Sequence, residues 1–271
     1  MHECQQCQRS FQRIASLRQH ESSTGHISSG SVPVVVVRNM RPVTKTTTAV
    51  EPIMDTSVQY HGIPSSQIKP VFKAACYSRF QEPVAADIIR TTRTTLEPDI
   101  VAAILEGALR LLPVDLTPEG QRIRREKEQA KAEHARKAEN DFVEHVRRLQ
   151  PAMLDEAQQK QRILAAKESG SPLKLLATPD ILFDEPTEIN GAACHWIEYK
   201  NMFGFKQNPF VQQKIKQQCR RYASLFGAGI IIYRLGFEVR LLDIEGVRVM
   251  RERDVSFWVS QQISLQEVRT L

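Results

Sequence analysis

The sequence lacks an apolar run long enough to cross a membrane, and it has few cysteines. No stretch approaches the roughly 18 consecutive apolar residues of a membrane-spanning helix, and Met1-His2-Glu3-Cys4 lacks the apolar core of a secretory signal. Five cysteines among 271 residues, without such a signal, indicate a reducing compartment rather than a disulfide framework. We therefore expect a nuclear or cytoplasmic protein with no membrane partner.

An excess of acidic charge is also absent. The chain has 37 Lys and Arg against 31 Asp and Glu, a net charge of +6. Charged residues make up 25% and hydrophobic residues 41%, which is ordinary for a soluble protein. The basic balance modestly favours an anionic partner, although a basic soluble protein without one is an equally open interpretation.

Changes in composition predict four segments. These are a metal-binding segment at 1–28, a largely flexible linker rich in Ser, Thr, Val and Pro at 29–70, a helical region at 71–138 and an α/β domain at 139–271. Within them we expect helices at 98–112, from Thr117 to about 149 and at 209–226, and strands at 180–184, 193–199, 229–234 and 237–243. Strands that alternate with helices predict an α/β fold.

The first segment contains a compact set of potential metal ligands. Two residues separate Cys4 from Cys7, twelve separate Cys7 from His20, and five separate His20 from His26. This spacing is typical of a Zn²⁺ site with two cysteines and two histidines, and it resembles the ββα zinc finger. Because protein ligands would fill all four positions, we expect the zinc to be structural.

Two roles are open for such a finger. In a finger that reads DNA, Arg13, Ser16 and Gln19 would face the bases, and Arg and Gln suit guanine and adenine edges. One finger covers about three base pairs, too few for a useful address alone. The finger would therefore add nonspecific nucleic-acid affinity or bind a protein.

Three charged residues adjoin two short apolar segments. Asp180 opens the run 181–183, and Glu198 and Lys200 close the run 194–197. Carboxylates are the oxygen ligands that Mg²⁺ or Mn²⁺ takes at phosphodiester-cleaving sites. Asp180 and Glu198 are therefore candidate metal ligands. Lys200 shares a strand face with Glu198 and would position the attacking water or stabilise charge on phosphorus. On spacing alone, three ordinary charges at strand ends is an open alternative.

The three groups meet only under a condition on the strand register. Asn190-Gly191 is a strong signal for a two-residue hairpin turn. A regular hairpin with that turn places Asp180 on the opposite face from Glu198 and Lys200. Pro186 lies inside the hairpin and has no N–H for the ladder, so a bulge there would restore the shared face.

The residues around this cluster resemble the TPD-motif nucleases of the PD-(D/E)xK superfamily. The resemblance covers about residues 140–245, without the finger. It depends on Thr178–Phe183, His195–Lys200, Phe203-Gly204 and the downstream spacing Gln218-x3-Tyr222-x3-Phe226-Gly227-x-Gly229. It implies a restriction-endonuclease-like mixed β-sheet flanked by helices, with metal-dependent cleavage of DNA or RNA by Asp180, Glu198 and Lys200. It also implies a codanin-like protein partner.

The same resemblance implies two further site residues. Gln218, on the following helix, would be an auxiliary site residue. Superfamily members often add an acid from a helix before the first strand. Glu144 is the first candidate, Glu156 the second and Glu139 the third. For each of the three acids, a solvated helix face is the alternative, and it is the favoured one for Glu139.

The segment after the cluster is basic. Between Lys200 and Tyr222 there are six basic residues and no Asp or Glu. Besides Lys200, the basic residues are Lys206, Lys214, Lys216, Arg220 and Arg221. Such residues contact phosphates without reading sequence, and a solvated basic face is the simpler alternative.

Two broader functions compete with a nuclease. One is a nonenzymatic adaptor that binds nucleic acid or protein through the finger and an inactive nuclease fold. The other is a zinc-finger regulator whose C-terminal domain assembles only with a partner. The intact set of Asp180, Glu198 and Lys200 favours the nuclease, because a scaffold has no physical need for all three groups.

Overall fold

The computed structural model describes residues 2–3, 10–11, 60–169, 177–208 and 212–269. The chain divides into two compact units, Met1–Met54 and Asp55–Leu271. In the first unit, β1 (His2–Glu3) pairs antiparallel with β2 (Ser10–Phe11). The four predicted zinc ligands and Arg13 lie outside the described residues, so the zinc site stays a prediction.

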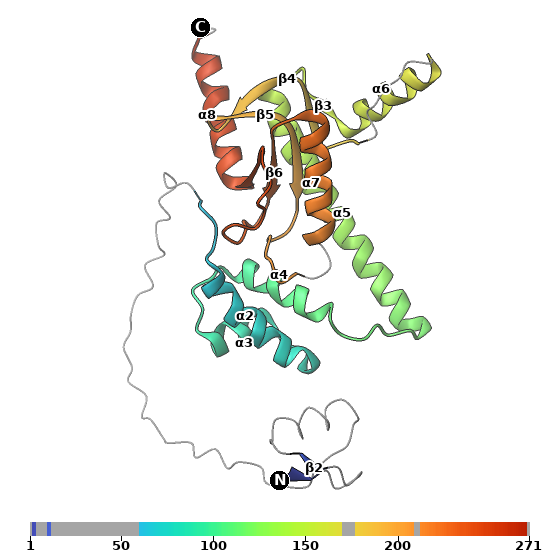
Figure 1. The fold of residues 1–271 in the computed structure, drawn as a ribbon, viewed down its shortest axis with the longest axis vertical. Helices are drawn as coiled ribbons and strands as arrows, with labels where there is room; N and C mark the ends of the chain where they lie inside the picture. Colours follow the sequence, from blue (N-terminus) through green and yellow to red (C-terminus); the bar gives the residue numbers. More distant parts are fainter. Residues whose placement is uncertain (1, 4–9, 12–59, 170–176, 209–211, 270–271) are drawn as a thin grey trace. The chain divides into compact units, whose positions relative to one another are not determined.

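The second unit contains a helical region followed by alternating helices and strands (Figure 1). Its helices are α2 (Ser65–Ser78), η1 (Arg79–Gln81), α3 (Ala85–Thr92), α4 (Pro98–Leu109), α5 (Pro118–Leu149), α6 (Glu156–Glu168), α7 (Gln212–Phe226) and α8 (Glu252–Arg269). Its strands are β3 (Leu154–Asp155), β4 (Ile181–Ile189), β5 (Ala192–Lys200), β6 (Gly229–Tyr233) and β7 (Val247–Arg251). The predicted α/β class is confirmed.

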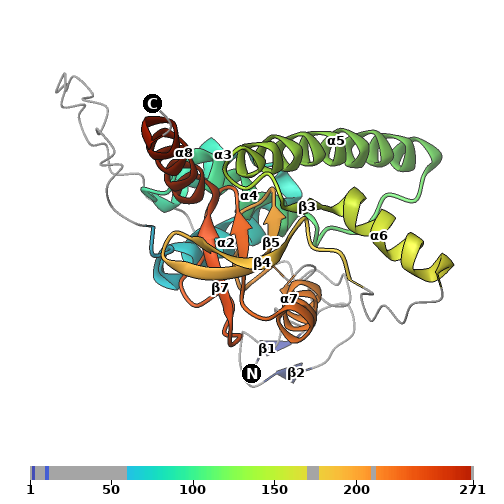
Figure 2. The ribbon, with the colours of Figure 1, turned by 90° about the horizontal axis from the view of Figure 1, so that it is seen from above.

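The five strands form one mixed sheet in the order β3-β4-β5-β6-β7. β3, β4 and β5 pair antiparallel, whereas β5, β6 and β7 pair parallel. Helix α7 makes the crossover that two parallel neighbours, β5 and β6, require. Figure 2 shows α5 and α8 on one face of the sheet and α7 on the other.

The helix starts follow local signals. The Thr117 side chain accepts a hydrogen bond of 3.1 Å from Gly120 N, and Pro118 is the first residue of α5, as the sequence predicts. Helix α4 begins at Pro98 but ends at Leu109, before the predicted residue 112. Helix α2 begins at Ser65, inside the predicted linker, and α5 continues through the boundary predicted at 138/139.

The strand predicted at 237–243 is wrong. Phe237 and Glu238 make only isolated bridges, to Gly204 and Ile63, and Arg240 has a positive φ of 55° that interrupts an extended conformation. The last strand of the sheet is β7 instead. Helices α6 and α8, which follow β3 and β7 directly, are not predicted from the sequence.

The hairpin turn is confirmed, and the bulge that the cluster requires is present. Asn190 and Gly191 have φ of 48° and 73°, and Ile189 pairs with Ala192, as in a two-residue turn with both φ positive. Between the pairs Thr187↔Cys194 and Leu182↔Trp196 the register shifts. Over that interval β4 advances by five residues and β5 by two, so three residues of β4 are extra. Because three is an odd number, the side chains of β4 before the bulge lie on the opposite face from the one that a regular hairpin would give them. A one-residue bulge would have the same effect.

A separate apolar core lies on each face of the sheet. Ile181, Ile197 and Tyr199 pack with residues of α5 and α8. Trp196 and Ile231 pack with residues of α7 on the other face. The helical region has its own core, which Phe203 and Phe205 enter from the segment after β5. This segment joins the helical region directly to the strand that ends at Lys200.

Trp196 fixes the spacing between β5 and β6. It is fully buried, its indole Nε1 donates to Gly227 O at 2.9 Å, and it meets Tyr222 edge-on at 5.2 Å. A Cβ on Gly229 would lie 2.1 Å from Trp196 Cε2. Only glycine therefore fits where β6 begins.

We predict that Gly229→Ala lowers the free energy of unfolding by roughly 1–3 kcal/mol, because the held indole has no room to move. Urea denaturation measures the change. Ala193→Val is the control, since it adds carbons at an exposed position of β5. Equal stability of Gly229→Ala and the parent protein would contradict this account of the packing.

Candidate functional site

The structure brings Asp180 beside the end of β5. Continuing the register Ile181↔Ile197 by one residue places Asp180 opposite Glu198, on the face that α7 covers. Asp180 Oδ2 accepts a hydrogen bond of 2.6 Å from Tyr199 N. The predicted meeting of Asp180, Glu198 and Lys200 therefore occurs, through the bulge in β4.

Glu198 is the most deeply buried member of the cluster. Its side chain is 3% exposed. Glu198 Oε1 accepts from Lys200 Nζ and, at 2.8 Å, from Gln218 Nε2. The second oxygen, Oε2, is buried and has no hydrogen-bond partner. A buried carboxylate oxygen without a donor is costly, so this atom is a natural ligand position for a cation.

The charges in the cluster shift one another's protonation. Burial, together with the nearby charges of Glu198 and Glu139, raises the pKa of Asp180 to about 8, although the Tyr199 N–H and Lys200 act in the opposite direction. Burial alone would lower the pKa of Lys200, but Glu198 and Asp180 outweigh burial and raise it. Lys200 therefore stays an ammonium at neutral pH, and it leaves the two carboxylates only partly neutralised.

A chain of hydrogen bonds holds Glu198 from α7. Gln218 Nε2 donates to Glu198 and also to Tyr222 Oη at 2.9 Å. Tyr222 Oη donates in turn to Thr178 O at 3.2 Å. Burial and the charge of Glu198 raise the pKa of Tyr222, so it remains a donor. The chain links the residues before Asp180 to its partner carboxylate.

The upstream acid that approaches the cluster is Glu139, not Glu144. Burial raises the pKa of Glu139, and the charge of Glu198 raises it further, which places Glu139 within electrostatic reach of the site. Glu144, five residues later on α5, has a side chain 64% exposed and pairs with Arg147 at 3.1 Å. Glu156 has an exposed side chain that pairs with Lys160 at 2.8 Å.

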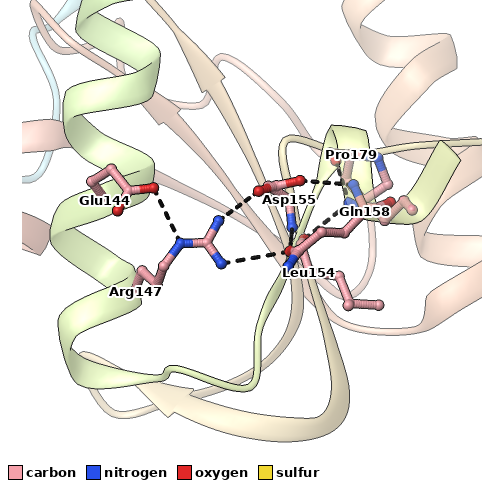
Figure 3. A network of polar contacts seen from close by, with 7 residues as sticks. Glu144, Arg147, Leu154, Asp155, Gln158 and Pro179 are labelled. Carbon is pink, nitrogen blue, oxygen red and sulfur yellow. Dashed lines mark hydrogen bonds and ion pairs between the residues drawn. The ribbon is translucent and has the colours of Figure 1, made fainter. Parts of the chain in front are cut away.

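Glu144 belongs instead to a polar brace between α5 and the start of α6 (Figure 3). Arg147 donates to Asp155 Oδ2 at 2.6 Å, and Asp155 caps α6 through Gln158 N at 2.8 Å. The next residue of α6, Gln159, is buried and donates to Leu154 O at 3.1 Å and to Pro179 O at 2.8 Å. The brace therefore fixes the backbone directly before Asp180.

The predicted basic residues take different places. Lys214, Arg220 and Arg221 are exposed on α7 and Lys216 is half-buried. By helical spacing, Lys214 and Arg221 lie on the same line as Gln218, which touches the cluster. Lys206 instead donates to Val239 O at 2.9 Å and lies 3.7 Å from the buried carboxylate of Glu238.

A divalent cation fits part of this cluster. Within the described ranges, no three His, Cys, Asp or Glu side chains are placed to hold a metal ion together. Mg²⁺, however, usually takes one or two carboxylates and completes its shell with water and phosphate oxygens. Asp180 and the free Oε2 of Glu198 meet that requirement.

Comparison with known proteins places this site in a family context. Residues 119–253 match the profile of a family described as a protein of unknown function with the TPD sequence motif. This segment carries the TPD family motif. The cluster and the brace lie inside the matched segment, as does all of α5 except its first residue, Pro118.

Curated relatives named CDAN1-interacting nuclease 1 show distant homology. The protein of Danio rerio is 37% identical over 62 residues, 22% of this chain and 19% of the relative. That of Gallus gallus is 35% identical over 78 residues, 29% of this chain and 26% of the relative. The matched stretches thus span about a fifth to a quarter of these relatives.

No solved structure matches the chain. In the described part of the chain, no helix is long and apolar enough to span a membrane.

We predict that Asp180→Asn stabilises the metal-free protein more at pH 8 than at pH 5. The pKa of Asp180 is raised above its unfolded value, so its contribution is complete below pH 4 and is lost as pH rises to about 8. Asparagine does not ionise and keeps the bond from Tyr199 N. Over that range the variant should gain on the order of 2–4 kcal/mol relative to the parent. Urea denaturation at both pH values checks this.

Asp141→Asn is the control for this pH effect, because Asp141 is exposed on the same helix as Glu139. Its effect on stability should not change with pH in this range. A stability gain for Asp180→Asn that is the same at pH 5 and pH 8 would contradict the raised pKa of Asp180, which burial and the charge of Glu198 cause.

Proposed function

We propose that the chain is a metal-dependent nuclease that hydrolyses phosphodiester bonds of DNA or RNA. The observation that carries the proposal is the convergence of Asp180 and Glu198, with an unpartnered carboxylate oxygen, beside Lys200. The family match and the distant homology to relatives named as nucleases support it. The mixed sheet with helices on both faces agrees with a restriction-endonuclease-like fold.

Asp180 and Glu198 would hold Mg²⁺ or Mn²⁺. When bound, the ion supplies positive charge at the scissile phosphate and lowers the pKa of a water molecule. Ionised Asp180 is needed to bind it, and the pKa of about 8 in the metal-free protein means that metal and proton compete for this carboxylate. Metal affinity should therefore rise with pH towards 8.

Lys200 and Gln218 act on charge and orientation. The raised pKa of Lys200 keeps its ammonium protonated, so it stabilises charge on phosphorus rather than accepting a proton. Gln218 fixes one oxygen of Glu198 and leaves the other open towards the site. Lys214 and Arg221, on the same line of α7, would contact phosphates of the substrate strand.

The remaining assignments extend beyond the described residues. Cys4, Cys7, His20 and His26 would bind a structural Zn²⁺.

The relatives' name describes them as interacting with CDAN1, and we propose a codanin-like partner for this chain as well. A nuclear or cytoplasmic location agrees with such partners. The alternative is a nonenzymatic adaptor on an inactive nuclease fold, which fits the lack of three converging ligand side chains in the described part.

We predict that Asp180→Ala and Glu198→Ala each reduce cleavage of labelled DNA or RNA in Mg²⁺ or Mn²⁺ by at least about 100-fold. The loss of a metal ligand should exceed the roughly 10–100-fold cost of removing an outer partner such as Gln218. A panel of single-stranded, duplex and branched substrates, analysed on denaturing gels, measures the activity. Unchanged cleavage by both variants would reject the proposed site, and binding without cleavage by the parent would favour the adaptor.

We predict that Glu139→Gln lowers cleavage by about tenfold or more, the cost expected for a residue that supports a metal site. Glu144→Gln should leave the rate unchanged, because its carboxylate faces Arg147 and solvent. The two substitutions are chemically identical and lie five residues apart on α5. A loss confined to Glu144→Gln would contradict the geometry described above.

A further inference from the structure

An exposed stripe of two basic and two aromatic residues follows α2 into η1. Lys69, Lys73, Tyr77 and Phe80 are spaced by four, four and three residues, so they lie on one line of the helix. Tyr77 is 75% exposed and Phe80 is 67% exposed. Aromatic rings this exposed contribute little to the core, which α2 builds instead from Ile68, Val71 and Ala75.

Each aromatic ring of the stripe has a cation beside it. Lys73 Nζ lies 5.9 Å from the centre of the Tyr77 ring, and Arg79 lies 4.6 Å from the centre of the Phe80 ring. From residue 65 to 93 there are five basic residues and two acidic ones. One of the acids, Asp87, pairs with Arg90 at 2.5 Å. The surface therefore offers rings together with a net positive charge.

A groove runs beside this stripe, between α2 and α3, which Figure 1 shows next to each other. Its volume is about 740 Å³, and its lining includes Lys73, Tyr77, Gln81, Asp87 and Arg90. That volume is in the range of sites that hold a small ligand. Gln81 adds an amide that can hydrogen-bond to a base edge.

We propose that the α2–η1–α3 surface binds a single-stranded stretch of nucleic acid. Successive bases stack on rings, while cations beside the rings contact the phosphates, and this combination is how proteins hold single strands without sequence preference. A duplex is a poor fit, because its bases are already stacked and paired. A purely apolar protein partner would leave the basic residues without a counterpart.

This proposal rests on the proposed function, because the strand bound at this surface would continue into the nuclease site. The surface and the site are connected through Phe203 and Phe205, which follow Lys200 by three and five residues and are fully buried in the core of the helical region. The surface and the site thus belong to one unit, and the substrate would carry an unpaired stretch beside the bond to be cleaved. The surface lies outside residues 119–253, the segment that matches the family.

The test measures binding without cleavage. The full chain in an Asp180→Asn background, without Mg²⁺, is titrated into labelled single-stranded DNA, the matching single-stranded RNA and a DNA duplex, followed by fluorescence anisotropy. Each strand is longer than about 16 nucleotides, the upper end of the usual site size. Because the assay measures binding and not cleavage, its result can be interpreted even if the chain is not a nuclease.

Tyr77→Ala combined with Phe80→Ala should raise the Kd for single strands by about tenfold or more and leave the Kd for duplex unchanged. The ring-retaining pair Tyr77→Phe and Phe80→Tyr should stay within about twofold of the parent. The control pair, Phe257→Ala and Leu265→Ala, removes two exposed apolar side chains from α8 and should also have no effect. All variants should have the same melting temperature as the parent protein, because the substituted side chains are exposed.

Two results would overturn the proposal. One is single-strand affinity of the alanine pair within about twofold of the parent, which would leave the surface for a protein partner. The other is equal weakening for single strand and duplex, which would show that the rings do not stack on bases.

Discussion

The odd offset between β4 and β5 is the constraint on which the candidate site depends. Three extra residues of β4 between Leu182 and Thr187 exchange the faces of the strand, so that Asp180 lies opposite Glu198 rather than behind it. With an even offset, Asp180 would enter the core with Ile197 and Tyr199, where a carboxylate has no partner. The bulge therefore determines whether the chain has a site at all.

The rest of the unit holds the two carboxylates together against their repulsion. The brace of Arg147, Asp155 and Gln159 fixes the backbone before Asp180, and Tyr222 and Gln218 fix Glu198 from α7. These polar contacts hold Asp180 close to Glu198, and ionising Asp180 there costs stability as the pH rises towards 8. Such arrangements occur where the charges have a chemical task, because burial alone would favour apolar residues.

Short-range chemistry made much of this predictable from the sequence. The Asn190-Gly191 turn, the cap at Thr117 and the need for a bulge near Pro186 all follow from local rules. The size of the bulge does not, because any odd number of extra residues gives the same faces. The strand at 237–243 was wrong because its apolar residues pack through a loop, a choice that tertiary contacts make. The sequence favours Glu144 over Glu139 as the upstream acid, because helical periodicity does not show which turn of α5 passes the end of β5. In the structure, Phe142 stacks on Tyr199 at 5.3 Å, and Glu139 lies about one helical turn before Phe142.

The proposal that Asp180 and Glu198 form a metal site is best tested by measuring the binding of a divalent metal. Mn²⁺ bound to the full chain can be counted by electron paramagnetic resonance in the presence of a phosphorothioate oligonucleotide. The account predicts a bound Mn²⁺ that is lost in Asp180→Asn and retained in Asp141→Asn, with affinity that rises as pH approaches 8. The same Mn²⁺ binding in Asp180→Asn as in the parent would contradict it.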